Sequence, residues 1–252
     1  LEYCIFLPLV IALYFLLPPP RRWPLLLIAS YWFYMSWKVE YIVLIVVSTL
    51  IDYFCGLRME KLPEKRQRRP YLIVSLCSNL TLLFAFKYFN FVNESVRTVF
   101  KAFDLSYAIP HFDVLLPVGI SFYTFQTLSY TIDVYRGKQA VERHLGIFAL
   151  YVSFFPQLVA GPIERSTNLL SQFYRTNRFE ASRAVSGLRL ILWGMFKKVM
   201  IADWAGIIVS TVFSDVRGHS GVQYIVALFF FAYQVYCDFS GYTDIARGSA
   251  RI

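Results

Sequence analysis

The sequence is poor in charged residues. Only 16% of its 252 residues are Asp, Glu, Lys or Arg, and 57% are hydrophobic, whereas soluble domains have about 25% charged and about 45–50% apolar residues. Apolar runs recur along the chain, at residues 3–17, 23–37, 41–51, 71–86, 114–132, 145–160, 188–213 and 222–236. Several runs are shorter than the about 17–25 residues of a membrane-spanning helix. The composition therefore excludes an ordinary soluble domain and predicts an all-α, polytopic transmembrane helical bundle with short tilted and re-entrant helices.

The sequence also lacks the patterns of a metal protein and of an internally repeated transporter. Its four cysteines are widely spaced, without a CxxC pair or any other metal-ligand spacing, so no metal site is expected. No internal repeat is present, and no pair of broken helices occupies matching positions in two halves of the chain. This absence argues against a transporter built from inverted repeats.

Basic residues predict the orientation in the membrane. Six of them lie in the short segment between the third and fourth apolar runs: Arg58, Lys61, Lys65, Arg66, Arg68 and Arg69. The positive-inside rule places such a segment in the cytoplasm, and counting back through three crossings puts the N-terminus outside. Residues 87–116, which contain Pro110 and His111, then form a long external connection. The same rule accounts for the net charge of +9, so no nucleic-acid partner is expected.

A second basic stretch suggests that one apolar run does not cross the membrane. Seven basic residues lie between Glu164 and the end of the next helix-like segment: Arg165, Arg175, Arg178, Arg183, Arg189, Lys197 and Lys198. They too should be cytoplasmic, yet only residues 145–162 separate them from the preceding cytoplasmic loop. Since one crossing cannot return to its own side, this run is predicted to enter the membrane and turn back. The alternative is a full crossing followed by a basic external segment.

Backbone breakers lie in that same run. The stretch FFPQLVAGP at 154–162 contains two prolines, a glycine and a glutamine. Proline removes a backbone donor, and broken backbone at membrane depth must be buried in protein or line a wet cavity. The candidate pore or channel residues here are Gln157, Gly161 and Pro162. The alternative is a proline-kinked helix held by its neighbours.

A second group of polar residues follows the last apolar run. The stretch YCDFSGYTD at 236–244 contains two aspartates, and a carboxylate in the membrane costs about 2.5–3.5 kcal/mol or more unless it faces a cavity or a partner. We expect a polar wall near a pore, made by Asp238, Ser240, Tyr242 and Asp244. The alternative is that the aspartates cap the next helix. The remaining aspartates that interrupt apolar runs are expected at helix ends: Asp52, Asp133 and Asp203.

Six ordered motifs resemble the membrane-bound O-acyltransferase (MBOAT) family. They are LLLIASYWFYMSW at 25–37, FKYFNF at 86–91, LLPVGISFYTFQTLSYTIDVYRG at 115–137, FFPQLVAGPIERSTNLLSQF at 154–173, FKKVMIAD at 196–203 and YCDFSGYTD at 236–244. The sequence is most similar to the bacterial branch that O-acetylates alginate, and next to the branch that D-alanylates teichoic acid. The likeness covers essentially the whole chain.

The resemblance implies a function and its partners. Members transfer an acyl group to a hydroxyl, here acetyl to an exported polysaccharide such as alginate, in the bacterial inner membrane. The acyl donor, acetyl-CoA or an acyl-carrier thioester, arrives from the cytoplasm as a co-substrate, and no bound cofactor is expected. Periplasmic acetylation partner proteins and membrane lipids are the other expected partners. Arg165 and Lys197 are possible donor-side basic residues, with solvated interfacial charge as the alternative.

The three histidines do not match the family's catalytic pattern. In the family the catalytic histidine lies in an apolar helix after the YCDFSGYTD-like motif, whereas His111, His144 and His219 precede this motif and lie in loop-like segments. The resemblance therefore implies that residues 1–252 form the N-terminal part of a single membrane-embedded domain. The catalytic histidine is expected beyond Ile252, and this stretch alone is expected to be inactive. Two alternatives stay open: D-alanyl transfer to teichoic acid, and a transporter or export-channel component.

Overall fold

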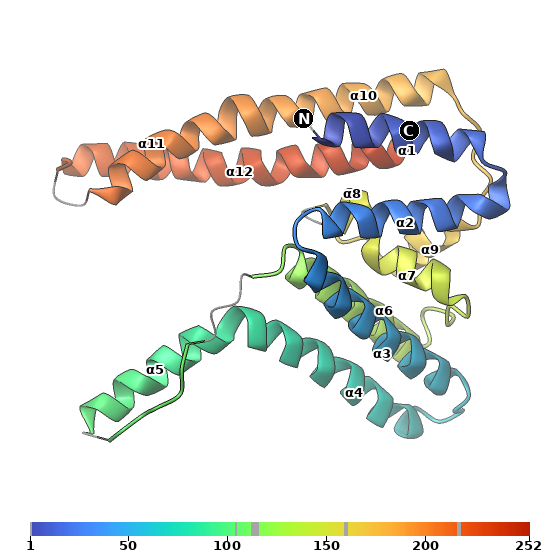
Figure 1. Ribbon diagram of the computed structural model, residues 1–252, viewed down its shortest axis with the longest axis horizontal. Coiled ribbons are helices and arrows are strands. Elements are labelled where there is room, and N and C mark those ends of the chain that lie inside the picture. Colours follow the sequence, from blue (N-terminus) through green and yellow to red (C-terminus); the bar gives the residue numbers. More distant parts are fainter. Residues whose placement is uncertain (1, 104, 112–115, 159–160, 216–217) are drawn as a thin grey trace. The chain divides into compact units, whose positions relative to one another are not determined.

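The chain folds into helices joined by short connections. The computed structural model describes residues 2–103, 105–111, 116–158, 161–215 and 218–252, and these residues contain no strand. Contacts divide the chain into two compact units (Figure 1), described separately below. The first unit comprises Leu1–Arg22, Pro156–Pro162 and Thr176–Ile252, and the second comprises Trp23–Phe155 and Ile163–Arg175.

Three helical stretches of the described residues are long and apolar enough to cross a membrane: Val39–Glu60, Lys65–Ala102 and Gly221–Arg251. A shorter apolar helix, α1, covers Glu2–Leu16. The prediction of an all-α membrane protein is confirmed. The N-terminus-outside orientation stays a prediction.

The second unit is built around three mutually packed helices. Its helices are all but the first residue of α2 (Arg22–Met35), η2 (Val39–Tyr41), α3 (Ile42–Glu60), α4 (Lys65–Leu83), η3 (Phe84–Tyr88), α5 (Phe89–Ala102), α6 (Ile120–Arg136), α7 (Leu145–Ser153) and α9 (Ser166–Phe173). Helices α3, α4 and α6 contact one another, and α7 packs on α3 and α6. The α6–α7 interface is aromatic, because the Phe148 ring lies 4.7 Å from that of Tyr130 and both side chains are fully buried.

The connection expected at residues 87–116 is helical over much of its length. Helix α4 continues through the π-helical turn η3 into α5, which ends at Ala102. Placing this whole segment in a connecting loop was wrong. The segment contains no proline or glycine between Phe84 and Ala102, so nothing in it stops the helix that begins at Lys65.

The first unit is dominated by a long helical hairpin. It contains α1, η1 (Pro19–Arg21), all but the first residue of α8 (Phe155–Leu158), α10 (Ala181–Met195), η4 (Phe196–Ala202), α11 (Asp203–Ser214) and α12 (Gly221–Arg251). Helices α10, η4 and α11 form one continuous helix that runs antiparallel to α12 (Figure 1). Helix α1 joins this hairpin through a hydrogen bond of 2.6 Å between the Tyr3 and Ser249 hydroxyls.

Glycines bring α10 against α12. A Cβ atom at Gly194 would lie 2.6 Å from the carbonyl oxygen of Gly241, and one at Gly187 would lie 2.7 Å from that of Gly248. Both distances are shorter than real Cβ contacts, and the obstructing atoms are backbone. The two helices therefore approach closely enough to require glycine at these four positions, as small residues allow in membrane helix pairs.

Of the three aspartates expected at helix ends, Asp133 lies in the last turn of α6. Asp203 is the first residue of α11 but lies inside the continuous helix formed by α10, η4 and α11, so the expectation was wrong for it. The expectation was also wrong for Asp52, which lies in the middle of α3 and is fully buried. Helix α3 continues past it to Glu60 because Ser75 and Asn79 of α4 hydrogen-bond its carboxyl group.

The glycine contacts predict that Gly194→Ala destabilises the protein. The added methyl group would push α10 away from α12, and such overpacking lowers the free energy of unfolding by about 1–3 kcal/mol. Thermal unfolding of the detergent-solubilised protein measures the effect. Gly221→Ala is the matched control, because a Cβ there meets nothing within 4 Å. Equal thermal stability of Gly194→Ala and Gly221→Ala would contradict the prediction.

Candidate functional site

Two sets of residues that the sequence singled out separately meet between η4 and α12. Lys197 and Lys198 are consecutive, yet both ammonium groups reach aspartates of α12. In a regular α-helix neighbouring side chains diverge by about 100°. Residues 196–202 form a π-helical turn instead, a feature that is frequent at functional sites.

The Lys197 contacts are nearly enclosed. Its Nζ lies 2.6 Å from Oδ2 of Asp244 and donates to Oγ of Ser240 at 2.8 Å. The side chains of Lys197 and Asp244 are 16% and 12% exposed. Ser240 and Asp244 are four residues apart on α12, so they lie on the same side of the helix. This ion pair therefore fastens η4 to α12 with charge-assisted hydrogen bonds.

The Lys198 contacts lie beside the first pair. Its Nζ is 2.8 Å from Oδ1 of Asp203 and 2.7 Å from Oδ1 of Asp238, and it lies 5.4 Å from the centre of the Tyr242 ring. We call Lys197, Lys198, Asp203, Asp238 and Asp244 the lysine–aspartate cluster. It contains two ammonium groups and three carboxylates, so it does not form an anion-binding patch.

The positions of Asp238 and Asp244 exclude the alternative that these aspartates cap the start of a helix. Helix α12 runs without interruption from Gly221 to Arg251, so Asp238 and Asp244 lie inside it. Their partners are lysine side chains, not the free amide groups of a helix start. Lys198 was not among the expected site residues, although its place directly after Lys197 in FKKVMIAD was a usable signal.

The ion pair predicts a large effect of Lys197→Met. The change leaves the Asp244 carboxylate buried without a partner, and breaking a buried pair in this way costs about 3–5 kcal/mol. The thermal stability of the detergent-solubilised protein measures it. The double variant Lys197→Met/Asp244→Leu should recover much of the loss, because no lone charge then remains.

Lys38→Met is the control for that comparison. Lys38 pairs with Glu40 at 3.3 Å, but the Glu40 side chain is 77% exposed, and such pairs contribute about 0–1 kcal/mol. If Lys197→Met is as stable as Lys38→Met, the cluster does not hold the two helices together.

The candidate pore residues lie at a tight backbone turn. The amide of Gly161 donates to the carbonyl of Gln157 at 3.1 Å, and a Cβ at Gly161 would lie 2.4 Å from Cα of Gln157. The Gln157 side chain is buried and Pro162 is partly exposed. Glycine at 161 is thus required by the turn itself. Residues 159 and 160 lie outside the described part of the chain.

The run at 145–162 forms two short helices. Helix α7 has nine residues, which give a length of about 14 Å, less than half of the about 30 Å hydrocarbon core. It ends at Ser153, because the following residue, Phe154, has a φ of −54° and a ψ of 112°, outside the helical region. Helix α8 follows. Helix α7 is too short to cross by itself, which supports the re-entrant prediction.

The re-entrant prediction requires both ends of this run to face the cytoplasm. In a cysteine-free background, single cysteines in place of Lys138 and Thr176, which are both exposed, should react with a membrane-impermeant maleimide only after the cytoplasmic side is opened. Labelling of the Thr176 position from outside, with the Lys138 position protected, would show a full crossing.

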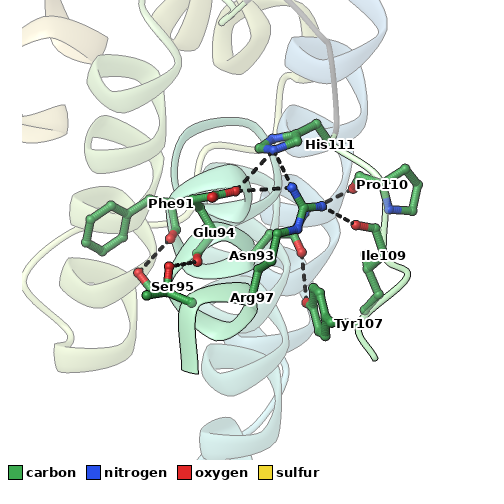
Figure 2. A network of polar contacts seen from close by, with 10 residues as sticks. Phe91, Asn93, Glu94, Ser95, Arg97, Tyr107, Ile109, Pro110 and His111 are labelled. Carbon is green, nitrogen blue, oxygen red and sulfur yellow. Dashed lines mark hydrogen bonds and ion pairs between the residues drawn. The ribbon is translucent and has the colours of Figure 1, made fainter. Parts of the chain in front are cut away.

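The three histidines lie outside the interiors of apolar helices. Figure 2 shows His111 in a polar network with α5, where its Nε2 lies 2.9 Å from Nη1 of Arg97 and 3.2 Å from Oε2 of Glu94. His144 precedes α7, and its Nδ1 accepts a hydrogen bond from the Ile147 amide. His219 follows Gly218 in the turn before α12. Each therefore has a surface or helix-capping position.

The basic residues proposed for the donor side have different surroundings. Arg165 is exposed and precedes α9, where its carbonyl accepts from the amides of Asn168 and Leu169. It belongs to the second unit, whereas Lys197 belongs to the first.

An apolar groove of about 440 Å³ lies beside the cluster. Its lining comes from η4, α11 and α12: Met200, Ile201, Trp204, Ala205, Ile208, Phe229, Phe230 and Tyr233. The lining offers no carboxylate, imidazole or ammonium group. The groove can hold hydrocarbon but cannot supply a general base.

Comparison with known proteins shows that the chain is similar to bacterial proteins named as O-acetylases or O-acetyltransferases. No family model matches it. It is 38% identical to the probable alginate O-acetylase AlgI of Azotobacter vinelandii over 247 residues, which are 97% of this chain and 48% of that protein. The AlgI protein of Pseudomonas aeruginosa is also 38% identical over 97% of this chain, with 46% of its own length covered.

A third relative is named for a different acceptor. The peptidoglycan O-acetyltransferase of Helicobacter pylori is 32% identical over an alignment of 277 residues, which covers 96% of this chain and 51% of that protein. The chain thus spans about half the length of the curated relatives it matches. The resemblance drawn from the motifs is confirmed: over 97% of its length, the chain is similar to proteins named as probable alginate O-acetylases.

Proposed function

We propose that this chain is part of a membrane O-acetyltransferase that transfers acetyl groups to hydroxyls of an exported polysaccharide. The observation that carries the proposal is the 38% identity to probable alginate O-acetylases over 97% of the chain. Because the chain spans about half of those proteins, the activity belongs to the whole protein. An alginate-like polymer is the proposed acceptor, since the identity to the peptidoglycan enzyme is lower, at 32%.

The reaction needs a general base, and none of the three histidines described in this chain lies inside an apolar helix. The acceptor hydroxyl loses a proton as its oxygen attacks the thioester carbonyl, and the departing thiolate takes up a proton. Histidine suits this role because its unperturbed pKa is about 6.5. His111, His144 and His219 have surface or capping positions, which supports a catalytic histidine beyond Ile252. Acetyl-CoA or an acyl-carrier thioester is the proposed donor.

The residues of this chain act as supporting groups in the proposal. In the proposal the polar residues of α12 act as two pairs on different sides of the helix. Lys197 holds Ser240 and Asp244 against η4, and Asp238 and Tyr242 lie beside Lys198. Gln157, Gly161 and Pro162 shape the channel at the tight turn after α8. Arg165 is the donor-side residue that is free to meet an acidic carrier, because Lys197 already pairs with Asp244. We propose that the enzyme acts in the inner membrane together with periplasmic acetylation partners.

The position of the histidines predicts the outcome of a triple substitution in the full-length protein. His111→Ala/His144→Asn/His219→Ala should keep most of the acetyl transfer, because none of the three lies at the proposed reaction centre. Asparagine at 144 keeps a side-chain acceptor for the start of α7. Acetyl esters on the exported polymer, measured by NMR, report the activity. Replacing the downstream apolar-helix histidine by alanine should abolish it.

Two outcomes would contradict the proposal. Loss of acetyl esters in the triple variant at normal membrane levels would place the reaction centre in this chain. Substrate flux in liposomes without any acyl donor, with no ester formed, would favour the transporter alternative. D-alanyl esters on teichoic acid would identify the other acceptor.

A further inference from the structure

Asp52 is the most deeply buried carboxyl group in the described part of the chain, and it does not belong to the lysine–aspartate cluster. It lies in the candidate span Val39–Glu60 and its exposed fraction is 0%. Its hydrogen-bond partners Ser75 and Asn79 lie in a second candidate span, Lys65–Ala102. The group is thus enclosed between two helices that the membrane surrounds.

Every hydrogen-bond partner of Asp52 is neutral. Oγ of Ser75 lies 2.5 Å from Oδ1, and Nδ2 of Asn79 lies 3.0 and 2.9 Å from Oδ1 and Oδ2. The other end of the Asn79 amide accepts from Ser48 at 2.7 Å and from Thr127 of α6 at 3.4 Å. The carboxyl group therefore connects α3 to α4 directly and reaches α6 through Asn79.

No cation balances this carboxyl group. Across the described residues, no lysine, arginine or histidine forms an ion pair with Asp52, whereas the other buried aspartate, Asp244, has Lys197 at 2.6 Å. The titratable side chains that α3, α6 and α7 bury are neutral near pH 7: Tyr53, Cys55, Tyr123, Tyr130 and Tyr151. Helix α4 buries none. An ionised Asp52 would carry an uncompensated charge inside the membrane.

The geometry favours a proton over a metal ion as the compensating charge. The Asn79 amide donates to both carboxyl oxygens and to the Ser75 carbonyl, so the N–H that bridges the two carboxyl oxygens occupies the position that a bidentate metal ion would need. A serine hydroxyl can accept a hydrogen bond as well as donate one. When Oδ1 of Asp52 is protonated, Oγ of Ser75 can therefore accept the hydrogen bond from it. We infer that Asp52 is a buried proton-binding site, whose neutral carboxylic acid joins α3 to α4 and, through Asn79, to α6.

A proton held in the folded state links stability to pH. The folded protein binds a proton at Asp52 that the unfolded chain releases in the same pH range. Stability therefore falls as pH rises, because the folded state then binds more protons than the unfolded state. Asparagine has the shape of a neutral carboxylic acid and cannot release a proton, so Asp52→Asn should abolish this part of the pH dependence.

The test compares one substitution at the two buried aspartates of the detergent-solubilised full-length protein. Asp52→Asn should exceed the wild-type Tm at pH 6, because the unfolded aspartate already releases its proton above about pH 4, and should exceed it by more at pH 9. Asp244→Asn is the matched control and should lower Tm at both pH values, because it leaves Lys197 buried without a counter-charge. A Tm of Asp52→Asn as low as that of Asp244→Asn at pH 6 would overturn the inference, because Asp52 would then be needed in its ionised form.

Infrared spectroscopy gives an independent readout that needs no acyl transfer. Isotope-edited spectra should contain the carbonyl band of a protonated aspartic acid at pH 7, which Asp52→Asn removes and Asp244→Asn keeps. Absence of the band in the wild type would overturn the inference. A rise in wild-type Tm with NaCl but not with KCl, lost in Asp52→Asn, would assign a metal ion and also overturn it. Neither measurement depends on the proposed acetyl transfer.

Discussion

The close approach of α10 to α12 is the constraint on which the first unit depends. Backbone atoms of Gly187 and Gly194 lie against those of Gly248 and Gly241, so no side chain separates the helices there. Apolar association gains little between helices already in lipid, and close packing and polar contacts take its place. Because the backbones are so near, Lys197 can reach both Ser240 and Asp244 while remaining mostly enclosed.

The chain satisfies its two enclosed aspartates in different ways. Asp244 receives an ammonium group from a neighbouring helix, whereas Asp52 is surrounded by hydroxyl and amide groups. The glycine contacts beside Asp244 bring the partner helix close to α12. A lysine of that helix can therefore reach the Asp244 carboxylate. In the three-helix core of the second unit, short Ser, Thr and Asn side chains fit between α3, α4 and α6 without separating them.

Much of the fold could be predicted from the sequence, because the signals were local. The prolines at 156 and 162 and Gly161 predicted a broken backbone, and the structure has a tight turn there. The polar residues at 238–244 were recognised because carboxylates are costly in a membrane. Their lysine partners could not be assigned, since pairing across about 45 residues depends on how two helices pack. Asp52 was misplaced for the same reason, because its partners lie on another helix. The helical extension through α5 was missed because charged residues resemble a loop when only hydropathy is considered.

The π-helical turn η4 has a consequence for how the long helix meets its partner. A π-helical turn contains an extra residue relative to an α-helix. The buried small residues of α10 include Gly187 and Gly194, seven positions apart, and the next ones are Ala202 and Ala205. The interval across the turn is thus eight residues, not seven. The extra residue therefore shifts by one the sequence positions that face α12. Lys197 and Lys198 both belong to this π-helical turn and both point towards α12. The change in helical register and the lysine–aspartate cluster therefore occur in the same turn.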